Sequence, residues 1–138
     1  MIYETMEEAM ENAPAGFPDV SGRNVYISGP IEHDADAALK FALAHRACIA
    51  GHAWTVFNPM AGAVQAARQG WTREQHMTAD LHVLTGGTVD LLLMLPGWRD
   101  SEGATIERAV AIECGIEQAE CELPERGDGP RAITNGRW

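Results

Sequence analysis

The most apolar run in the chain, residues 89–95 (VDLLLML), constrains the fold more than any other feature. A run of large apolar residues is typical of a parallel strand with both faces buried, because a strand with one solvated face alternates with polar residues. Pro96-Gly97 ends the run. An unpaired carboxylate inside the run is costly, so we expect Asp90 to lie at the start of the strand and to contact backbone or solvent. Such a strand requires a sheet that is covered on both sides.

Two further segments, 24–28 and 54–57, predict short strands, and each stops at a turn that contains proline. Helices are predicted over residues 34–50, 72–84 and 102–114 from apolar spacing and end signals. The turns and caps that bound these elements are Gly29-Pro30, Asn58-Pro59, Gly51, the capping box Thr72-Arg73-Glu74-Gln75, Gly86-Gly87 and Gly115.

Strands that alternate with helices predict right-handed crossovers and a parallel sheet. The expected fold is therefore α/β, a small Rossmann-like (flavodoxin-like) sheet of about four or five parallel strands with helices on both faces. In open α/β sheets, ligands bind outside the carboxyl ends of the strands. The three strand ends are therefore expected to form one pocket.

The length of 138 residues suits a single domain. We expect residues 23–123 to form this domain. Residues 1–22 are interpreted as an acidic N-terminal extension, either loosely ordered or docked on a neighbouring subunit or another partner, and residues 124–138 as a C-terminal tail. Within the domain, residues 60–71 are expected to be a variable connection, and residues 120–123 to add an edge strand.

The composition excludes several classes of function. Ten Lys and Arg against twenty Asp and Glu give a net charge of −10, which argues against binding polymeric nucleic acid or an anionic membrane surface. The three cysteines show no CxxC spacing, so a zinc finger, a redox motif and a disulfide scaffold are not expected. The first residues are acidic, unlike a signal peptide, and no apolar run reaches membrane-spanning length, so a cytoplasmic protein is expected.

No metal and no cofactor are expected from the motifs. His33, Asp34 and Asp36 follow the first strand, and His76 and Asp80 lie one helical turn apart. Neither set has the number of ligands that a zinc site needs. The GxGxxG and GxxxxGK motifs of dinucleotide sites and P-loops are also absent.

Residues 101–107 (SEGATIE) hold the strongest candidates for chemistry, because they follow the apolar strand and open a helix. Backbone N–H groups near Ser101 and Gly103 can face an anion there. The positive end of the helix dipole is expected to favour the ionised form of Glu107, which is either a functional carboxylate or an ordinary acid near a helix start. From the residues alone, Asp80 is expected on a solvated helix face, and Tyr26 as a buried packing residue.

Four motifs in order resemble one known family. They are YISGPI from Tyr26, Asp80-Leu81 in a helix, VDLLLMLPGW from Val89 and SEGATIERAVA from Ser101. This order resembles the nucleoside 2-deoxyribosyltransferase-like superfamily over about residues 24–115. The PGW-x-x-S-x-G-A-x-x-E form is most similar to its small, often phage-encoded members, and the chain is also similar to nucleoside 5′-monophosphate N-glycosidases.

The resemblance implies cleavage of the N-glycosidic bond of a nucleoside or a nucleoside 5′-monophosphate. Glu107 would attack the anomeric carbon and form a glycosyl-enzyme, Asp80 would handle the proton of the base, and Tyr26 would orient the nucleophile. Double displacement needs such a division between an ionised carboxylate and an acid–base group. Residues at the strand ends and at the start of the last helix would bind substrate: Ser28, Gly29, Pro30, Asn58, Gly97, Trp98, Ser101 and Gly103.

The choice of substrate and acceptor stays open between several readings. The resemblance places Ser101 at a position where nucleoside-using members carry an aspartate, and a serine at that position favours a phosphate. The acidic loop that contains Glu32 and Asp34, in contrast, is a poor phosphate clamp. Hydrolysis is somewhat favoured over transfer of the sugar to another base. The alternatives are a nucleoside 2-deoxyribosyltransferase and a non-catalytic protein that binds or senses a nucleotide. The resemblance also implies a homo-oligomer, a dimer or larger.

Overall fold

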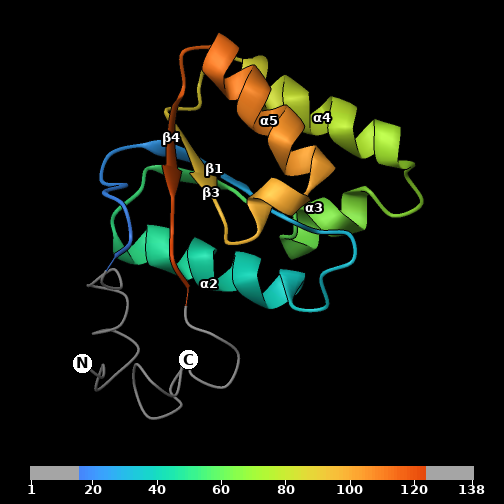
Figure 1. The fold of residues 1–138 in the computed structure, drawn as a ribbon, viewed down its shortest axis with the longest axis horizontal. Coiled ribbons are helices and arrows are strands. Elements are labelled where there is room, and N and C mark those ends of the chain that lie inside the picture. Colours follow the sequence, from blue (N-terminus) through green and yellow to red (C-terminus); the bar gives the residue numbers. More distant parts are fainter. Residues whose placement is uncertain (1–15, 124–138) are drawn as a thin grey trace.

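The computed structural model describes residues 16–123, which form a four-stranded sheet covered by helices (Figure 1). The strands are β1 (Asn24–Ser28), β2 (Thr55–Phe57), β3 (Leu91–Met94) and β4 (Glu117–Glu120). All pairs are parallel, in the order β2-β1-β3-β4. This order matches the first four positions of the flavodoxin-like sheet, so the predicted α/β fold class is confirmed.

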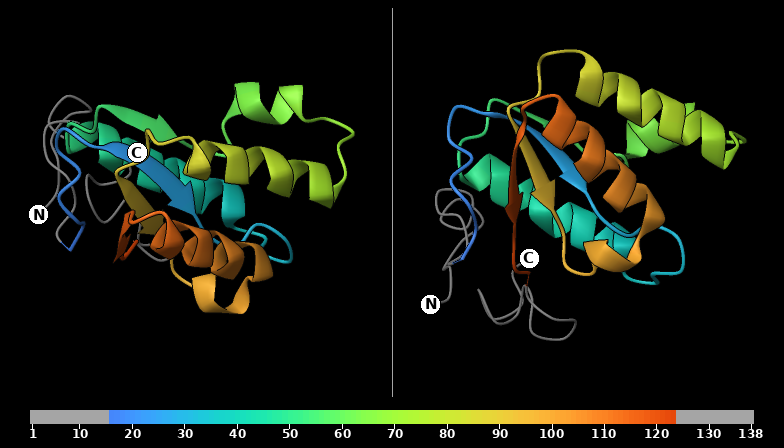
Figure 2. Two further views of the ribbon diagram at one scale, coloured as in Figure 1. Left: turned by 90° about the horizontal axis from the view of Figure 1, so that it is seen from above. Right: turned by 45° about the horizontal axis from the view of Figure 1, so that its top comes forward.

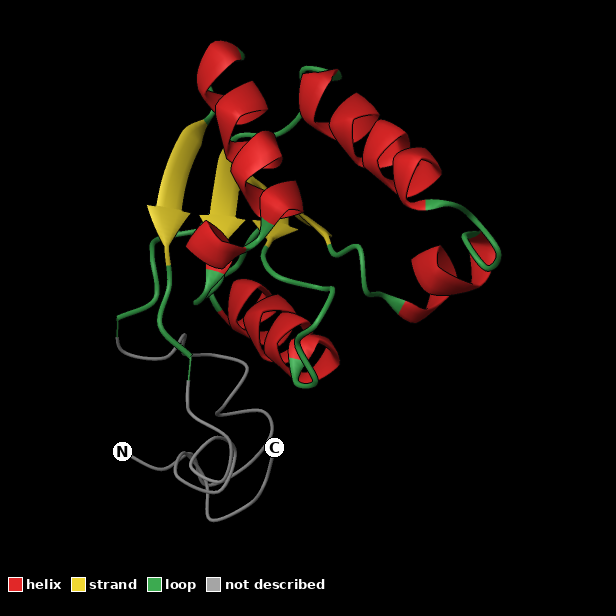
Figure 3. Ribbon diagram, turned by 45° about the vertical axis from the view of Figure 1, so that its right-hand side comes forward, coloured by secondary structure: helices red, strands yellow, loops and turns green. Residues whose placement is uncertain are grey.

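Helices lie on both faces of the sheet, as Figures 2 and 3 show. Helix α2 (Ala37–Ala50) covers one face, below the sheet in Figure 1, whereas α4 (Arg73–Thr85) and α5 (Glu102–Glu113) lie above it. A short helix, α3 (Gly62–Ala67), precedes α4, and the 3₁₀ turn η1 (Trp98–Asp100) links β3 to α5. The carboxyl ends of the strands lie near the starts of α4 and α5.

The core consists of two apolar clusters, because successive residues of a strand point to opposite faces. Val25 and Ile27 of β1 pack with Phe41 of α2 in one cluster. Tyr26, between them, packs with Ala104 of α5 in the other. The residues of β3 divide in the same way and are all buried, which confirms the prediction of a strand covered on both faces.

The sequence predicted most boundaries within a few residues. Helix α4 begins at the expected capping box, in which Thr72 Oγ1 accepts from the Gln75 N–H at 3.2 Å and Gln75 Oε1 accepts from the Thr72 N–H at 2.8 Å. Asp90 Oδ2 accepts from the backbone N–H of Asn24 at 2.8 Å, which confirms its expected backbone contact.

The sequence analysis misplaced one strand and did not predict one helix. The edge strand β4 spans Glu117–Glu120 instead of residues 120–123, because the chain enters the sheet soon after Gly115, whose φ is 73°. The expected variable connection contains α3, which has no buried residue and no side-chain cap at Ala61. Such a helix leaves neither an apolar period nor a start signal in the sequence.

The ends of the expected domain are only partly described. Val20, which the sequence analysis placed in the extension, is buried in the cluster around Phe41. The rest of that segment up to residue 15, and the predicted tail 124–138, lie outside the described residues. Between residues 16 and 123, no helix has the length and apolar character needed to cross a membrane.

Candidate active site

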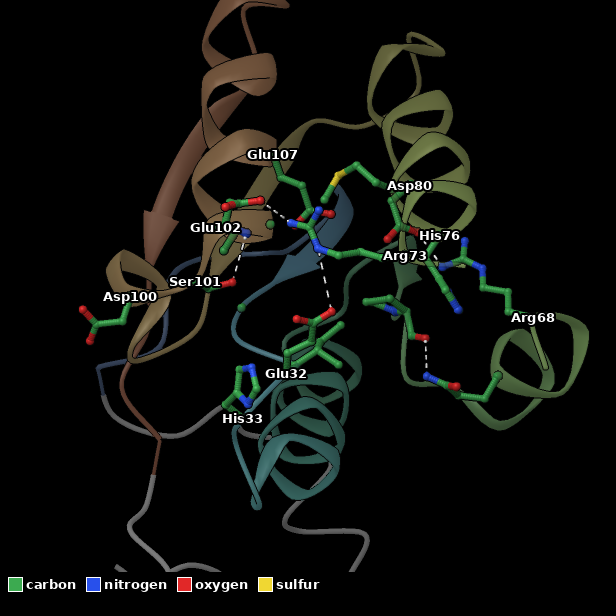
Figure 4. A pocket seen from close by; sticks show the side chains of 17 residues that line it. Glu32, His33, Arg68, Arg73, His76, Asp80, Asp100, Ser101, Glu102 and Glu107 are labelled. Atoms are coloured by element: carbon green, nitrogen blue, oxygen red, sulfur yellow. Dashed lines mark hydrogen bonds and ion pairs between the residues drawn. The ribbon is translucent and has the colours of Figure 1, made fainter. Parts of the chain in front are cut away.

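A cavity of about 420 Å³ lies at the carboxyl ends of the strands (Figure 4). Its volume is within the usual range for a small-molecule site. Its walls come from the segments after β1, β2 and β3, from the end of α3, and from the first turns of α4 and α5. The lining residues are Gly29, Ile31, Glu32, His33, Pro59, Gln65, Arg68, Arg73, His76, Met77, Asp80, Asp100, Ser101, Glu102, Gly103, Ala104 and Glu107.

The Glu107 carboxylate accepts hydrogen bonds from two hydroxyl groups of β1. Tyr26 and Ser28 are two residues apart on the strand, so both side chains point to the face that α5 covers. Tyr26 donates its hydroxyl to Glu107 Oε2, and Ser28 Oγ donates to Oε1 at 2.6 Å. One donor on each oxygen fixes the plane of the carboxylate against the cavity wall.

The protonation of Glu107 is governed by burial. Glu107 is only 6% exposed. Burial, and to a smaller extent the nearby charge of Asp80, raise the pKa of Glu107 to about 7. The hydrogen bonds from Ser28 and Tyr26 and the charge of Arg68 oppose this rise. The expectation that the helix dipole favours the ionised form was wrong in its net direction. Glu107 lies beyond the first turn of α5, where the dipole is weak.

Asp80 lies across the cavity on α4 and is paired with an arginine. Asp80 is 6% exposed, so its expected place on a solvated helix face was wrong. Its Oδ1 lies 2.6 Å from Nη1 of Arg68, which is 7% exposed. Burial raises the pKa of Asp80, while Arg68 and, more weakly, His76 oppose that rise. Two carboxyl groups therefore share one buried region with one buried guanidinium.

The mouth of the cavity is crossed by ion pairs. Arg73, at the start of α4, binds Glu102 at 2.6 Å and lies 3.7 Å from Glu32 (Figure 4). Ser101 caps α5, and its Oγ accepts from the Ala104 N–H at 3.2 Å. The hydroxyl hydrogen of Ser101 stays available for a ligand. The mouth therefore carries the exposed cation of Arg73, the start of α5 and three exposed carboxylates, those of Glu32, Asp100 and Glu102.

Four of the residues expected to bind substrate are not among those that line the cavity. Gly29 lines it and packs closely, since a Cβ there would lie 2.8 Å from Leu95 Cβ. Asn58 instead contacts His45 Nδ1 at 3.1 Å, and Trp98 is buried in the core.

Five of the predicted residues line the cavity directly, and the others lie beside or behind it. The five that line it are Gly29, Asp80, Ser101, Gly103 and Glu107; those behind Glu107 are Tyr26 and Ser28; those outside the lining are Pro30, Asn58, Gly97 and Trp98.

Sequence reasoning missed the cationic residues of the cavity. Arg68 follows α3, the helix that the sequence did not predict, so no pattern placed it near Asp80. Arg73 was identified only as part of a capping box. In the range 16–123, no three His, Cys, Asp or Glu residues are grouped to hold a metal.

The comparisons with known proteins identify the family. No curated protein and no solved structure matches the chain. The family model described as "Domain of unknown function (DUF4406)" matches residues 23–119, a span that includes every residue lining the cavity. The resemblance to nucleoside 2-deoxyribosyltransferases stays a prediction. The chain belongs to the DUF4406 family.

Proposed function

We propose that this protein cleaves the N-glycosidic bond of a nucleoside or a nucleoside 5′-monophosphate through a glycosyl-enzyme on Glu107. Water is favoured over a second base as the acceptor of the sugar. One observation carries the proposal: a buried carboxylate, oriented by two hydroxyl donors, lines a cavity of suitable size opposite a second buried carboxyl group, Asp80.

The chemistry divides between the two carboxyl groups. In the first step, an ionised Glu107 oxygen forms a bond to the anomeric carbon while the bond to the base breaks, and the base takes a proton from Asp80. In the second step, Asp80 takes a proton from water, whose oxygen displaces Glu107. The Tyr26 and Ser28 hydroxyls keep the carboxylate in one orientation, which reduces the entropy lost on reaching the transition state.

The mouth of the cavity supports both substrate classes. Arg73, the Ser101 hydroxyl and the start of α5 favour a 5′-phosphate, because each offers a donor or positive potential. Glu32 and Glu102 oppose it, and both pair with Arg73. We therefore keep the nucleoside and the monophosphate as alternatives.

Base release tests the proposal directly. Nucleosides and 5′-monophosphates, in ribo and deoxy forms, are incubated with wild type, Glu107→Gln and the matched control Glu113→Gln, which changes an exposed glutamate of the same helix. We expect release by wild type and the control but not by Glu107→Gln. Mass spectrometry of rapidly quenched protein is expected to detect a sugar adduct on residue 107.

The same experiment separates the alternatives. Release only when an acceptor base is added identifies a transferase. Nucleotide binding without release, equal in wild type and Glu107→Gln, contradicts an enzyme and supports a binding or sensing protein. Light scattering of the same samples tests the expected homo-oligomer.

A further inference from the structure

We propose that Arg68 is a positioning residue of this site, which fixes the Asp80 carboxylate at the cavity wall and supplies the positive charge beside the two carboxyl groups. The inference deepens the proposed function, and its kinetic consequences rest on that function. Its electrostatic consequences do not, and they are measurable without any substrate.

The guanidinium of Arg68 is held in a defined place. The backbone N–H of Arg68 donates to the carbonyls of Val64 and Gln65, each at 3.1 Å, which anchors the residue at the end of α3. The guanidinium lies over the rings of Phe57 and Trp71, with centroids 5.8 and 5.6 Å away. A planar cation that contacts two aromatic rings keeps a fixed orientation, unlike an arginine in solvent.

Stability alone does not explain this arrangement. The residues of α3 include none that is buried, so the helix adds little to the apolar core, yet Arg68 directly after it is buried. A buried ion pair gains about as much from attraction as it loses in desolvation, and an apolar pair of the same volume is often as stable. The segment therefore brings a cation to Asp80 at no clear gain in folding energy, which fits a role in the cavity.

The charge of Arg68 acts on both carboxyl groups. The groups that face them are Tyr26 from β1, His76 from α4, Arg68 from the end of α3, and the opposite carboxyl itself. Arg68 lowers the pKa of Asp80 and of Glu107, against the rise that burial causes. Without Arg68, both carboxyl groups should hold their protons to higher pH, and the ionised form of Glu107 becomes scarcer at neutral pH.

Carboxyl titration of the full-length protein by ¹³C NMR tests the electrostatic part. Arg68→Met keeps the apolar stem and removes the charge, so the midpoint of Asp80, which Arg68 contacts at 2.6 Å, should rise by at least about one pH unit. The midpoint of Glu107, on which the charge of Arg68 acts more weakly, should rise less. Arg68→Lys keeps the charge, so the Asp80 midpoint in this variant should stay near the wild-type value. Arg99→Met, which changes an exposed side chain of η1, is the control and should change neither titration. An unchanged Asp80 midpoint in Arg68→Met overturns the inference.

The pH profile of kcat tests the positioning part. In Arg68→Met, kcat at neutral pH should fall about 100-fold, and the acid limb should move to higher pH. Arg68→Lys should restore the acid limb but remain about tenfold slow, because an ammonium on a flexible stem lacks the planar shape that the contacts with Phe57 and Trp71 hold in place. Wild-type kcat in Arg68→Lys overturns the positioning role.

Two outcomes keep the two proposals distinct. If the titrations move as expected but no variant, nor wild type, releases a base, the proposed function fails and the role of Arg68 stands. If wild type releases a base but Arg68→Met titrates like wild type, the role of Arg68 fails alone. Should Arg68→Met not fold, Arg68→Lys carries the test of the positioning role, because it keeps the charge and its kcat should still fall about tenfold.

Discussion

The two buried carboxyl groups of the cavity are held in different ways. Glu107 accepts hydrogen bonds from two neutral hydroxyls, those of Tyr26 and Ser28, whereas Asp80 faces the full charge of Arg68. Neutral donors oppose the effect of burial only in part, and the pKa of Glu107 rises to about 7. The comparison teaches that the strand side of the site fixes orientation, while the arginine side also sets charge.

The supports of the two groups differ as well. Strand β1 is hydrogen-bonded on both sides, to β2 and to β3, so the donors to Glu107 belong to the interior of the sheet. Arg68 follows α3, which has no buried residue. The Asp80 side of the cavity therefore depends on fewer contacts, and it is the side that we expect to open more readily.

The largest expected effect distinguishes the two carboxyl groups in cleavage. Glu107→Gln keeps the side-chain shape but removes the nucleophile, so base release should fall by at least about 10⁴-fold. Asp80→Asn removes a group that only moves a proton, so the loss should be about 10²- to 10³-fold. Single-turnover base release measures both.

A substrate with an activated base sharpens this comparison. A nucleoside whose base already carries a positive charge needs no proton to leave, so it should restore cleavage in Asp80→Asn but not in Glu107→Gln. Equal rescue of both variants, or of neither, contradicts the division of roles.

Because Glu107 is buried, we expect it to make the free energy of unfolding depend on pH. The pKa of Glu107 is raised from its ordinary 4.5 to about 7, so the unfolded chain loses this proton first as the pH rises. The contribution of Glu107 to stability is therefore complete below about pH 4.5 and is lost as the pH rises through about 7. As the pH rises from 4 to 8, the free energy of unfolding of Glu107→Gln should increase by up to about 3 kcal/mol relative to that of wild type.

Chemical denaturation across this pH range measures the difference. Glu113→Gln, which changes an exposed side chain of α5, should show no such trend relative to wild type. A constant difference between Glu107→Gln and wild type would mean that Glu107 titrates as an ordinary carboxyl group.

Removing the hydroxyl donors one at a time tests the strand side of the comparison. Tyr26→Phe and Ser28→Ala each remove one hydrogen bond to Glu107 and should raise its pKa further, because each donor favours the ionised form. We expect kcat at neutral pH to fall about tenfold in each variant, with a smaller loss at higher pH. The pH profile of kcat provides the measurement. A loss that is the same at every pH contradicts the electrostatic reason.

The sequence placed the strand side of the candidate site at the carboxyl ends of the strands, for a local reason. Each strand stops at a turn residue, and the residues that follow a parallel strand lie at the ligand-binding edge. Tyr26 and Ser28 share a strand face by simple alternation. Glu107 lies near the start of α5, the helix that follows β3, and β3 pairs with β1. Its place near β1 therefore follows from the fold class.

The arginine side was beyond the reach of the sequence, for a physical reason. Helix α3 has no buried residue and no side-chain cap, so neither periodicity nor a start signal marks it. The contact between Arg68 and Asp80 depends on how α3 lies beside α4, which is a tertiary arrangement. The rise in the pKa of Glu107 was missed for a related reason, since burial is a property of the packed chain and outweighs the local helix dipole.

The smallest effect is expected at the mouth of the cavity, where charges are exposed. Arg73 is 43% exposed, so its ion pairs should contribute at most about 1 kcal/mol to stability, and Arg73→Gln should barely change the melting temperature. If Arg73 binds a 5′-phosphate, Arg73→Gln should lower kcat/KM for a monophosphate about tenfold and leave that for its nucleoside within about twofold.

Glu102→Gln is the opposite change and completes this last test. It removes the carboxylate that competes for Arg73 at 2.6 Å, so the ratio of kcat/KM for the monophosphate to that for the nucleoside should rise. The measurement is made at low salt, because salt screens the interactions between exposed charges. A ratio that neither variant changes rules out the mouth as the phosphate site. Discrimination between nucleoside and nucleotide would then depend on the buried side of the cavity, where the charge of Arg68 already pairs with Asp80.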